Sequence, residues 1–409
     1  MKILLATSAA IPSGGGIASY NQELLKVLSD DNSLYLLTDA NEQNVDGFSH
    51  TESTFGKSIT SYEYIKDIVE RINDAEYDLI INSASSFIPV ICPFLKAPII
   101  SVSHYVNGYL ADKAGYNSQY QGAIISLSEY GKEYLINRFN ITECDKIHVV
   151  YNFVHPKKFQ DNHKESSQEL SIIFPGGTSI HKSFDVVLEA ALMLKKTALN
   201  FRFIWLGVTK LPSAKFSLLK ARTINQFLGN DSRFEIKGKV ARQEAEALIA
   251  SSNMFVLPSR GEGCPMTLLE AMRGGCIPVI SDAKHGSIEL INMCGAGIVV
   301  PQNDSKLLFS YLTNVILHHS EYTDYYEKTR QFSESRLSPE LWRKQMINII
   351  SQVANSSKKI ESLNKKAYER NLRPYRRMFL KYRLQTMIDS AVNRMKMDWL
   401  YLNWIILKK

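Results

Sequence analysis

Two glutamates eight residues apart, Glu262 and Glu270, stand out in the stretch PSRGEGCPMTLLEAMRGG at 258–275. Pro265 suits the first turn of a helix, MTLLEAM is strong helix-forming sequence, and a Gly-Gly pair ends it. Glu262 is therefore predicted in the loop before the helix, and Glu270 about a turn and a half inside it. The two carboxylates can reach one cleft from different heights, with the helix N-terminus between them.

This arrangement suits a nucleotide sugar. A diphosphate at the helix N-terminus would be stabilised by free N–H groups and by the helix dipole. A carboxylate offers two acceptor oxygens to a diol, so Glu270 suits a ribose and Glu262 a sugar hydroxyl. Two other interpretations stay open, namely a pair of surface acids or the acid and nucleophile of a glycosidase. Cys264 beside Glu262 is either a nucleophile or, as we favour, a small buried thiol.

A glycine-rich segment, GGGIAS at 14–19, is the second candidate binding element. It nearly fits the dinucleotide fingerprint G-x-G-x-x-G, and Asp39 ends the next predicted strand. However, the last position is Ser19, and seven residues separate Ala6, near the strand end, from Gly14. A longer glycine loop before a helix still suits phosphate, which we favour over a dinucleotide fingerprint or a surface loop without a ligand.

The elements around these motifs alternate between short apolar runs and helical patterns, as in a parallel α/β protein. The predicted strands are 2–6, 33–39, 77–83, 97–104, 122–128, 146–152, 170–177, 201–207, 233–240, 254–259 and 277–282. The predicted helices are 17–30, 62–74, 129–139, 184–196, 242–252, 266–275 and 338–353. Ligands of open α/β sheets bind beyond the carboxyl ends of the strands, so the loops that leave strands should carry the site.

A polar stretch at 160–169, QDNHKESSQE, divides the pattern into two α/β units and reads as a linker. We therefore expect two Rossmann-like domains facing a cleft and a basic helical tail. The predicted boundaries are 1–160 for the first domain, 170–337 for the second, 338–353 for a closing helix and 354–409 for the tail.

Composition is that of a globular protein, with 45% hydrophobic and 22% charged residues in 409. Neither a signal peptide nor an apolar run long enough to span a bilayer is visible, and the five cysteines show no C-x-x-C pair. We therefore expect reduced thiols and a cytoplasmic protein.

The tail from Lys358 to Lys409 is strongly basic, with 14 Lys or Arg against 4 Asp or Glu, and it is rich in Tyr and Trp. This mixture favours an anionic membrane surface, which would place the protein on the inner face of the cell membrane. Packing on the body or on a partner protein is the second interpretation. Nucleic acid is the least favoured.

In the order of its motifs, the chain resembles a family 4 glycosyltransferase of the GT-B fold, of the bacterial polysaccharide-biosynthesis type. The family's E-x7-E pattern, P-S-R-x-E-G-F-G-L-x-x-L-E-A-M-A-x-G-x-P-V-I, is matched by PSRGEG, LEAM and PVI. GGGIASYNQELLKVL, VSHYVN, LSEYGKEYL, KIHVVYNFVHPKKF and GGTSIHKSFDVVLEA follow further family landmarks in order, over about residues 1–353.

The resemblance implies a role for each matched residue. Lys182 would neutralise the departing phosphates, Glu262 would hold the donor sugar, and His104 would contact the sugar or the transition state. Donor binding would further involve Gly15, Gly16, Gly176, Gly177, Val240, Cys264, Met266, Thr267 and Glu270. Without the resemblance, His104 would be taken as structural and Lys182 as an exposed helix-start lysine.

The chain departs from the family pattern at several positions. Gly177 stands where the family has an arginine, which removes one phosphate cation, and His181 and Lys182 are the nearest replacements. Ser183 replaces a glycine, and Pro265 replaces another and so removes one N–H from the sugar site. Phe153 and His155 stand where Gly and Asp are common.

The implied reaction is retaining transfer from a nucleotide-sugar donor to a hydroxyl of a glycan, which the tail suggests is lipid-linked. The resemblance implies neither a cofactor nor a metal. The alternative is a nucleotide-sugar or dinucleotide-binding protein without transferase activity. Base, sugar, acceptor and linkage are not encoded in any motif that we can interpret.

Overall fold

The computed structural model describes residues 1–9, 16–29, 31–155, 169–207, 222–356 and 358–407. The chain divides into two compact units. The first contains Met1–Asn152 with Glu340–Arg383, and the second contains Phe153–Pro339 with Leu384–Lys409. The linker predicted at 160–169 lies almost wholly outside the described residues. No helix in the described part of the chain is long and apolar enough to cross a membrane.

The first unit is built on a seven-stranded sheet in the order β3-β2-β1-β4-β5-β6-β7, and every pair of neighbours is parallel. The strands are β1 Lys2–Thr7, β2 Ser33–Thr38, β3 His50–Ser53, β4 Leu79–Ser83, β5 Ile99–Ser103, β6 Ala123–Ser126 and β7 Ile147–Val149. Strands β4 and β5 are buried along their whole length, as expected when helices cover both faces of a parallel sheet.

The helices of this unit follow from local sequence. They are α1 Gly16–Leu28, α2 Tyr62–Asp74, α3 Ile88–Ile91, α4 Gly108–Gly115, α5 Glu129–Phe139 and α13 Pro339–Ala354. Helix α2 shows why such segments are predictable. Ser61 caps its first turn by accepting from the Tyr64 N–H, and Ile65, Ile68, Val69 and Ile72 bury one apolar stripe.

The second unit has a six-stranded parallel sheet in the order β10-β9-β8-β11-β12-β13. Its strands are β8 Leu170–Phe174, β9 Phe201–Trp205, β10 Phe234–Ile236, β11 Met254–Leu257, β12 Ile277–Ser281 and β13 Ile298–Val300. Its helices are α6 Phe184–Lys195, α7 Arg222–Leu228, α8 Arg242–Ser251, α9 Met266–Arg273, α10 Gly286–Cys294, α11 Ser305–Leu317 and α12 Thr323–Arg336. Both units are therefore doubly wound α/β domains, and the predicted fold class is confirmed.

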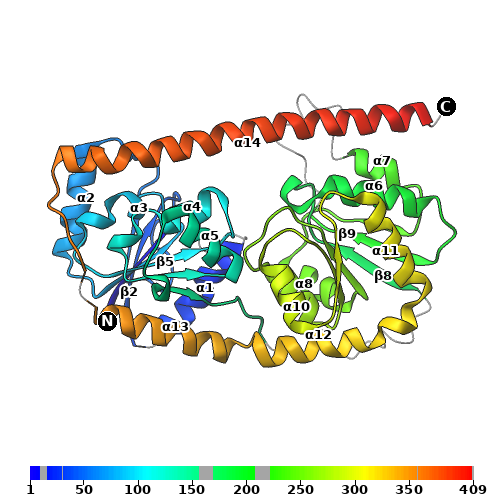
Figure 1. The fold of residues 1–409 in the computed structure, drawn as a ribbon, viewed down its shortest axis with the longest axis horizontal. Coiled ribbons are helices and arrows are strands. Elements are labelled where there is room, and N and C mark those ends of the chain that lie inside the picture. Colours follow the sequence, from blue (N-terminus) through cyan, green and yellow to red (C-terminus); the bar gives the residue numbers. More distant parts are fainter. Residues whose placement is uncertain (10–15, 30, 156–168, 208–221, 357, 408–409) are drawn as a thin grey trace. The chain divides into compact units, whose positions relative to one another are not determined.

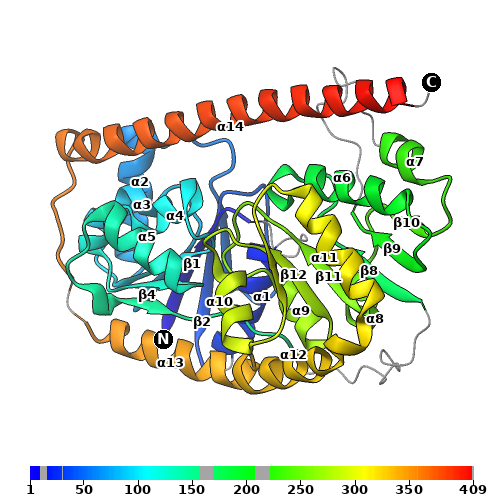
Figure 2. The same cartoon turned by 45° about the vertical axis from the view of Figure 1, so that its right-hand side comes forward.

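The basic tail forms a long helix, α14 Lys365–Leu407, with Pro374 inside it. Its first half belongs to the first unit, where it lies over α2 and α3 (Figures 1 and 2). Tyr368 and Tyr375 are each 1% exposed, and Ala367, Leu372 and Met378 share the same apolar cluster. From Leu384 onward the described apolar side chains are exposed, with Leu384 at 60% and Met395 at 73%.

Candidate functional site

The second unit brings Lys182 and Glu262 together, although 80 residues separate them. Lys182 ends a short 3-10 turn after β8, and Glu262 lies in the loop after β11. The Lys182 Nζ pairs with the Glu262 Oε1, and the Ser259 hydroxyl donates to the same oxygen at 2.9 Å. Glu262 is only 7% exposed. Lys182 and Ser259 therefore hold a nearly buried carboxylate at the carboxyl edge of the sheet.

Arg260, which sequence reasoning missed, fixes the two loops against each other. Its backbone N–H donates to the His181 carbonyl at 2.8 Å, and its Nη2 pairs with the buried Asp185 carboxylate at 2.9 Å. A third link joins its Nη1 to the Ile180 carbonyl. These contacts set Lys182 beside Glu262, and no local sequence pattern connects Arg260 to Asp185.

At position 177, where the family pattern has an arginine, the backbone leaves no room for a side chain. Gly177 has φ +56°, and a Cβ there would lie 2.5 Å from the Gly207 carbonyl oxygen. The Trp205 indole also donates to the Gly177 carbonyl at 2.8 Å, which holds the turn in place. A side chain at 177 would have to displace backbone. The basic residues next to this turn are Lys182, which pairs with Glu262, and the exposed His181. Gly176 is confined as well, with Phe174 2.1 Å from its added Cβ.

Helix α9 begins at Met266, as predicted, but Pro265 lies just before its first turn. Pro265 is the N-cap, with φ −71° and ψ 122°, and its carbonyl accepts from the Leu268 and Leu269 N–H groups. The prediction of Pro265 in the first turn is therefore wrong by one residue. The amides of Met266 and Thr267 stand at the helix start, where an α-helix offers no carbonyl partner. Glu270 is partly exposed inside the helix.

Cys264, just before this helix, is a free thiol and 4% exposed, so the interpretation as a small buried thiol is confirmed. Val240 lies in the loop after β10 and is partly exposed.

His285 is a second residue that the sequence did not reveal. It caps α10, its Nδ1 accepts from the Ser287 N–H at 3.2 Å, and its Nε2 lies 3.2 Å from the Ser281 hydroxyl. Burial lowers the pKa of His285 to about 4, while the Glu262 carboxylate opposes this shift and the Lys182 ammonium adds to it. A histidine three residues beyond a strand-end Ser-Asp pair, just before a helix, is the signal that could have found it.

In the first unit, His104 directly follows β5 and is 7% exposed. Its Nε2 lies 2.9 Å from the Ser83 hydroxyl at the end of β4, and the edge of the Tyr20 ring meets it at a centroid distance of 5.0 Å. Burial lowers the pKa of His104 to about 3, so the ring is neutral near pH 7. Gly16 is the first residue of α1, the helix that also carries Tyr20. Gly15 lies outside the described residues.

Asp39, which the dinucleotide interpretation would place on a ribose, forms hydrogen bonds within the first unit. Its carboxylate accepts from the Ser86 N–H at 2.8 Å and from the Thr54 hydroxyl at 3.2 Å. Close by, Lys113 donates to the Ala84 carbonyl and the Ser86 hydroxyl, each at 3.0 Å. Burial lowers the pKa of Lys113 to about 8, opposed by Asp39. Both side chains fix the loop after β4, which gives Asp39 a structural task.

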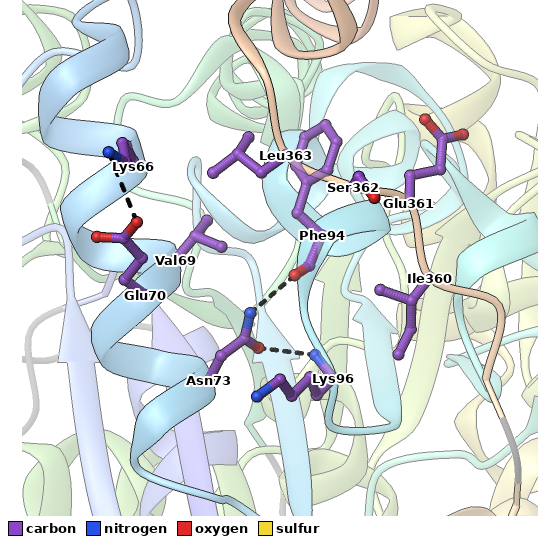
Figure 3. Close-up of a pocket in the computed structure, with 10 residues that line it drawn as sticks. All are labelled: Lys66, Val69, Glu70, Asn73, Phe94, Lys96, Ile360, Glu361, Ser362 and Leu363. Atoms are coloured by element: carbon purple, nitrogen blue, oxygen red, sulfur yellow. Dashed lines mark hydrogen bonds and ion pairs between the residues drawn. The ribbon is translucent and has the colours of Figure 1, made fainter.

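A pocket of about 330 Å³ lies elsewhere in the first unit (Figure 3). Lys66 and Asn73 on α2, Lys96 before β5, and Glu361 line parts of it. The Asn73 amide joins the Phe94 carbonyl and the Lys96 N–H at 2.9 and 2.8 Å. Because α2 ends and β5 begins there, this pocket is at the amino edge of the sheet, opposite His104.

No group of three or more His, Cys, Asp or Glu suited to a metal ion occurs among the described residues. Two Rossmann-like sheets, each with candidate residues at its carboxyl edge, agree with the predicted GT-B fold. Solved structures agree on this fold. The lipopolysaccharide outer core galactosyltransferase WaaB, in its apo form, aligns with a TM-score of 0.67 over 86% of this chain and 99% of its own, at 18% identity. Anabaena Alr3699/HepE, in complex with UDP-glucose, aligns with a TM-score of 0.67 over 86% and 99%, at 14% identity.

Residues 156–332 match the family model of glycosyl transferases group 1, which is a little over two fifths of the chain. The putative colanic acid biosynthesis glycosyltransferase WcaL of Escherichia coli K12 is 30% identical over 151 residues. That match spans 36% of this chain and 36% of the relative, so it covers little more than a third of either protein.

Proposed function

We propose that this chain moves a sugar from a nucleotide-sugar donor to a hydroxyl of a glycan in cell-surface polysaccharide synthesis, with retention of the anomeric configuration. The family match over 156–332 supports the transferase class, and the relative named for colanic acid biosynthesis supports the polysaccharide setting. The neighbour solved with UDP-glucose supports a nucleotide-sugar donor.

The pairing of Lys182 with Glu262 at the start of α9 is the observation that carries the proposal. The donor diphosphate would lie near the Lys182 ammonium and the first amides of α9, which favour negative charge. Glu262 would accept from a hydroxyl of the donor sugar, with Cys264 and Met266 orienting it through backbone N–H groups. Glu270 would hold the ribose, and the backbone near Val240 would meet the base.

The proposed reaction is a same-face substitution. The bond between the anomeric carbon and the phosphate oxygen breaks, and a bond to the acceptor oxygen forms on the same face. The proton of the acceptor hydroxyl passes to the departing diphosphate. Lys182 and the α9 amides stabilise the charge that develops on the diphosphate, which is the electrostatic contribution expected to be largest. No step uses a metal or a cofactor.

A lipid-linked acceptor on a membrane surface is the part of the proposal supported by α14. Its apolar residues Leu380, Leu384, Met387, Ile388 and Val392 recur at helical spacing and are between 49% and 63% exposed. Arg376, Arg377, Lys381 and Arg383 are exposed beside them. Such a face suits an anionic bilayer.

Membrane binding is tested by flotation of the full chain with vesicles of phosphatidylcholine containing phosphatidylglycerol. Leu384→Gln with Ile388→Gln should lower the floated fraction, whereas Leu307→Gln on α11, also exposed, should not. Point variants are preferable to truncation before α14, because truncation would remove Tyr368 and Tyr375 from the core of the first unit. Equal flotation of all three proteins would remove the membrane from the proposal.

Activity is tested by incubating the full chain with UDP-, GDP- and ADP-sugars and lipid-linked glycans extracted from bacterial membranes. The expected result is transfer from one donor, with the product bond in the donor's anomeric configuration by NMR. Nucleotide binding without transfer, under conditions where a known transferase acts on the same acceptors, would favour a binding protein instead.

A further inference from the structure

A chain of buried hydrogen bonds runs from β1 to His104 in the first unit. The Asn21 Nδ2 on α1 donates to the Thr7 hydroxyl at 2.9 Å, and the Ser83 hydroxyl donates to the Asn21 Oδ1 at 2.6 Å. Ser83 then lies 2.9 Å from the His104 Nε2. Thr7, Asn21 and Ser83 are each fully buried, so water does not compete for these hydrogen bonds.

The donor and acceptor in each of these hydrogen bonds follow from the protons that the side chains carry. A distance of 2.6 Å is typical of an O–H donor, and 2.9 Å is typical of an N–H donor, which fits the Asn21 amide as placed. The Ser83 hydroxyl has one proton, which it donates in its hydrogen bond to the Asn21 Oδ1. The bond between Ser83 and His104 therefore requires the proton of the imidazole, carried on Nε2.

We propose that Ser83 and Asn21 are positioning residues that hold His104 as the Nε2–H tautomer, so that Nδ1 presents a lone pair to a substrate hydroxyl. This inference rests on the proposed glycosyl transfer for its purpose. The tautomer itself depends only on the hydrogen bonds of the first unit.

The surroundings of the ring support a fixed neutral imidazole. Tyr20 meets its edge on one side, and burial raises the pKa of that phenol, so it too stays neutral. Tyr20 is held in turn against Trp342 and the Met346 sulfur of α13. Among the described residues, no charged group is a cause of the lowered pKa of His104, which follows from burial alone. A neutral ring with one proton already engaged can act at Nδ1 only as an acceptor.

Imidazole ¹⁵N NMR of the full chain tests this directly. Two-bond ¹H–¹⁵N spectra of ¹⁵N-histidine-labelled protein distinguish the tautomers, and the His104→Gln spectrum identifies the signal. Wild type should show a protonated Nε2 and an unprotonated Nδ1. A protonated Nδ1 in wild type would overturn the proposal.

Variants distinguish an imposed tautomer from the intrinsic preference of imidazole. Asn21→Leu removes the acceptor of the Ser83 hydroxyl, which is then free to donate to Nε2, so the ring should shift toward the Nδ1–H form. Ser83→Ala removes the acceptor of Nε2–H and should give a mixture of both forms. Ser101→Ala is the matched control, because Ser101 is a buried serine on the neighbouring strand that accepts from Asn82. An unchanged tautomer in both Asn21→Leu and Ser83→Ala would refute the proposal, and either folded variant suffices for the comparison.

Release of nucleoside diphosphate from UDP-, GDP- and ADP-glucose provides the second readout. Asn21→Leu and Ser83→Ala should each lower kcat/KM by about tenfold, the size expected for one lost hydrogen bond. Ser83→Thr, which keeps the hydroxyl, should recover most of the activity, and Ser101→Ala should retain it. Loss in Ser101→Ala equal to that in Ser83→Ala would show a general packing effect and contradict the positioning role. If wild type releases no nucleoside diphosphate from any UDP-, GDP- or ADP-sugar in the presence of the acceptor glycans, the proposed function fails, while the NMR result still decides the tautomer.

Discussion

The candidate residues of the two units differ in how they are stabilised. In the second unit, Lys182 and Glu262 are charged and held by an ion pair, a serine hydroxyl and the neighbouring Arg260. In the first unit, His104 is neutral and lies against the Ser83 hydroxyl and the Tyr20 ring. The charged arrangement suits a diphosphate, whose charge must be balanced, and the neutral one suits sugar hydroxyls. Substitutions that remove charge should therefore act most strongly in the second unit.

The largest effect is expected from Lys182→Met. Loss of a cation beside the leaving group should lower kcat/KM about 10² to 10³-fold, as removal of a preorganised charge-stabilising donor does. Lys328→Met is the matched control, because Lys328 pairs with Asp324 on the surface of α12, where ion pairs contribute little. Nucleoside diphosphate release measures both. Equal activity of the two variants would contradict the role of Lys182.

The next effect concerns the tail as part of the first unit. Tyr368→Ala removes a side chain that is 1% exposed and should lower the free energy of unfolding by about 3 kcal/mol. Leu384→Ala, 60% exposed on the same helix, should change it by less than about 0.5 kcal/mol. Urea unfolding followed by circular dichroism makes the comparison. Similar small changes in both would mean that α14 is not part of the core.

Smaller changes in stability, opposite in sign to each other, are expected from substitutions at Gly177 and Ser183, two residues of the second unit with positive φ. Gly177→Ala places a Cβ 2.5 Å from the Gly207 oxygen at φ +56° and should destabilise by about 2 kcal/mol. Ser183 also has positive φ, +56°, and its buried hydroxyl has no hydrogen-bond partner among the described residues. Ser183→Gly should therefore stabilise by about 0.5 to 1 kcal/mol. Thermal unfolding measures both, and a loss of stability in Ser183→Gly would refute this interpretation of the turn.

The two units also share a pH dependence of stability. Burial lowers the pKa of His104 to about 3 and that of His285 to about 4, whereas both histidines titrate near 6.5 when unfolded. Below pH 6.5 the unfolded state binds more protons, so stability is present above this pH and is lost as pH falls toward the folded values. Each histidine should contribute a slope of at most about 1.4 kcal/mol per pH unit.

Urea unfolding between pH 5 and 7 measures this slope. His104→Gln and His285→Gln should each lower the slope by at most about 1.4 kcal/mol per pH unit. A slope that stays at the wild-type value in both variants would show that the buried histidines are not its source.

Local sequence was enough for elements whose signals are local. Helices α2 and α5 lie where they were predicted, because Ser61 and Ser128 cap them and their apolar faces have helical spacing. Strand β3 was missed because HTES has no apolar pattern, and it forms only by pairing with β2. The register of Pro265 was misjudged by one residue because a proline fits both the cap and the first turn.

The candidate site residues could be predicted only where a motif included them. Lys182, Glu262 and His104 were predicted from their place in ordered motifs, and their roles stay predictions. The Arg260–Asp185 and Ser83–Asn21 pairs depend on contacts between residues up to 75 positions apart, which the sequence does not display. The closeness of Gly177 to Gly207 is likewise a property of the folded backbone.

The most direct test of the donor site is a thermal-shift panel of UDP, GDP, ADP and their common sugar conjugates, repeated with Glu270→Ala. One nucleotide class should raise the Tm of wild type, and the shift should be lost in the variant while the Tm without nucleotide stays close to that of wild type. Stabilisation that survives in Glu270→Ala would contradict ribose binding by this carboxylate. No shift with any nucleotide would contradict a donor site built from Lys182, Glu262 and α9.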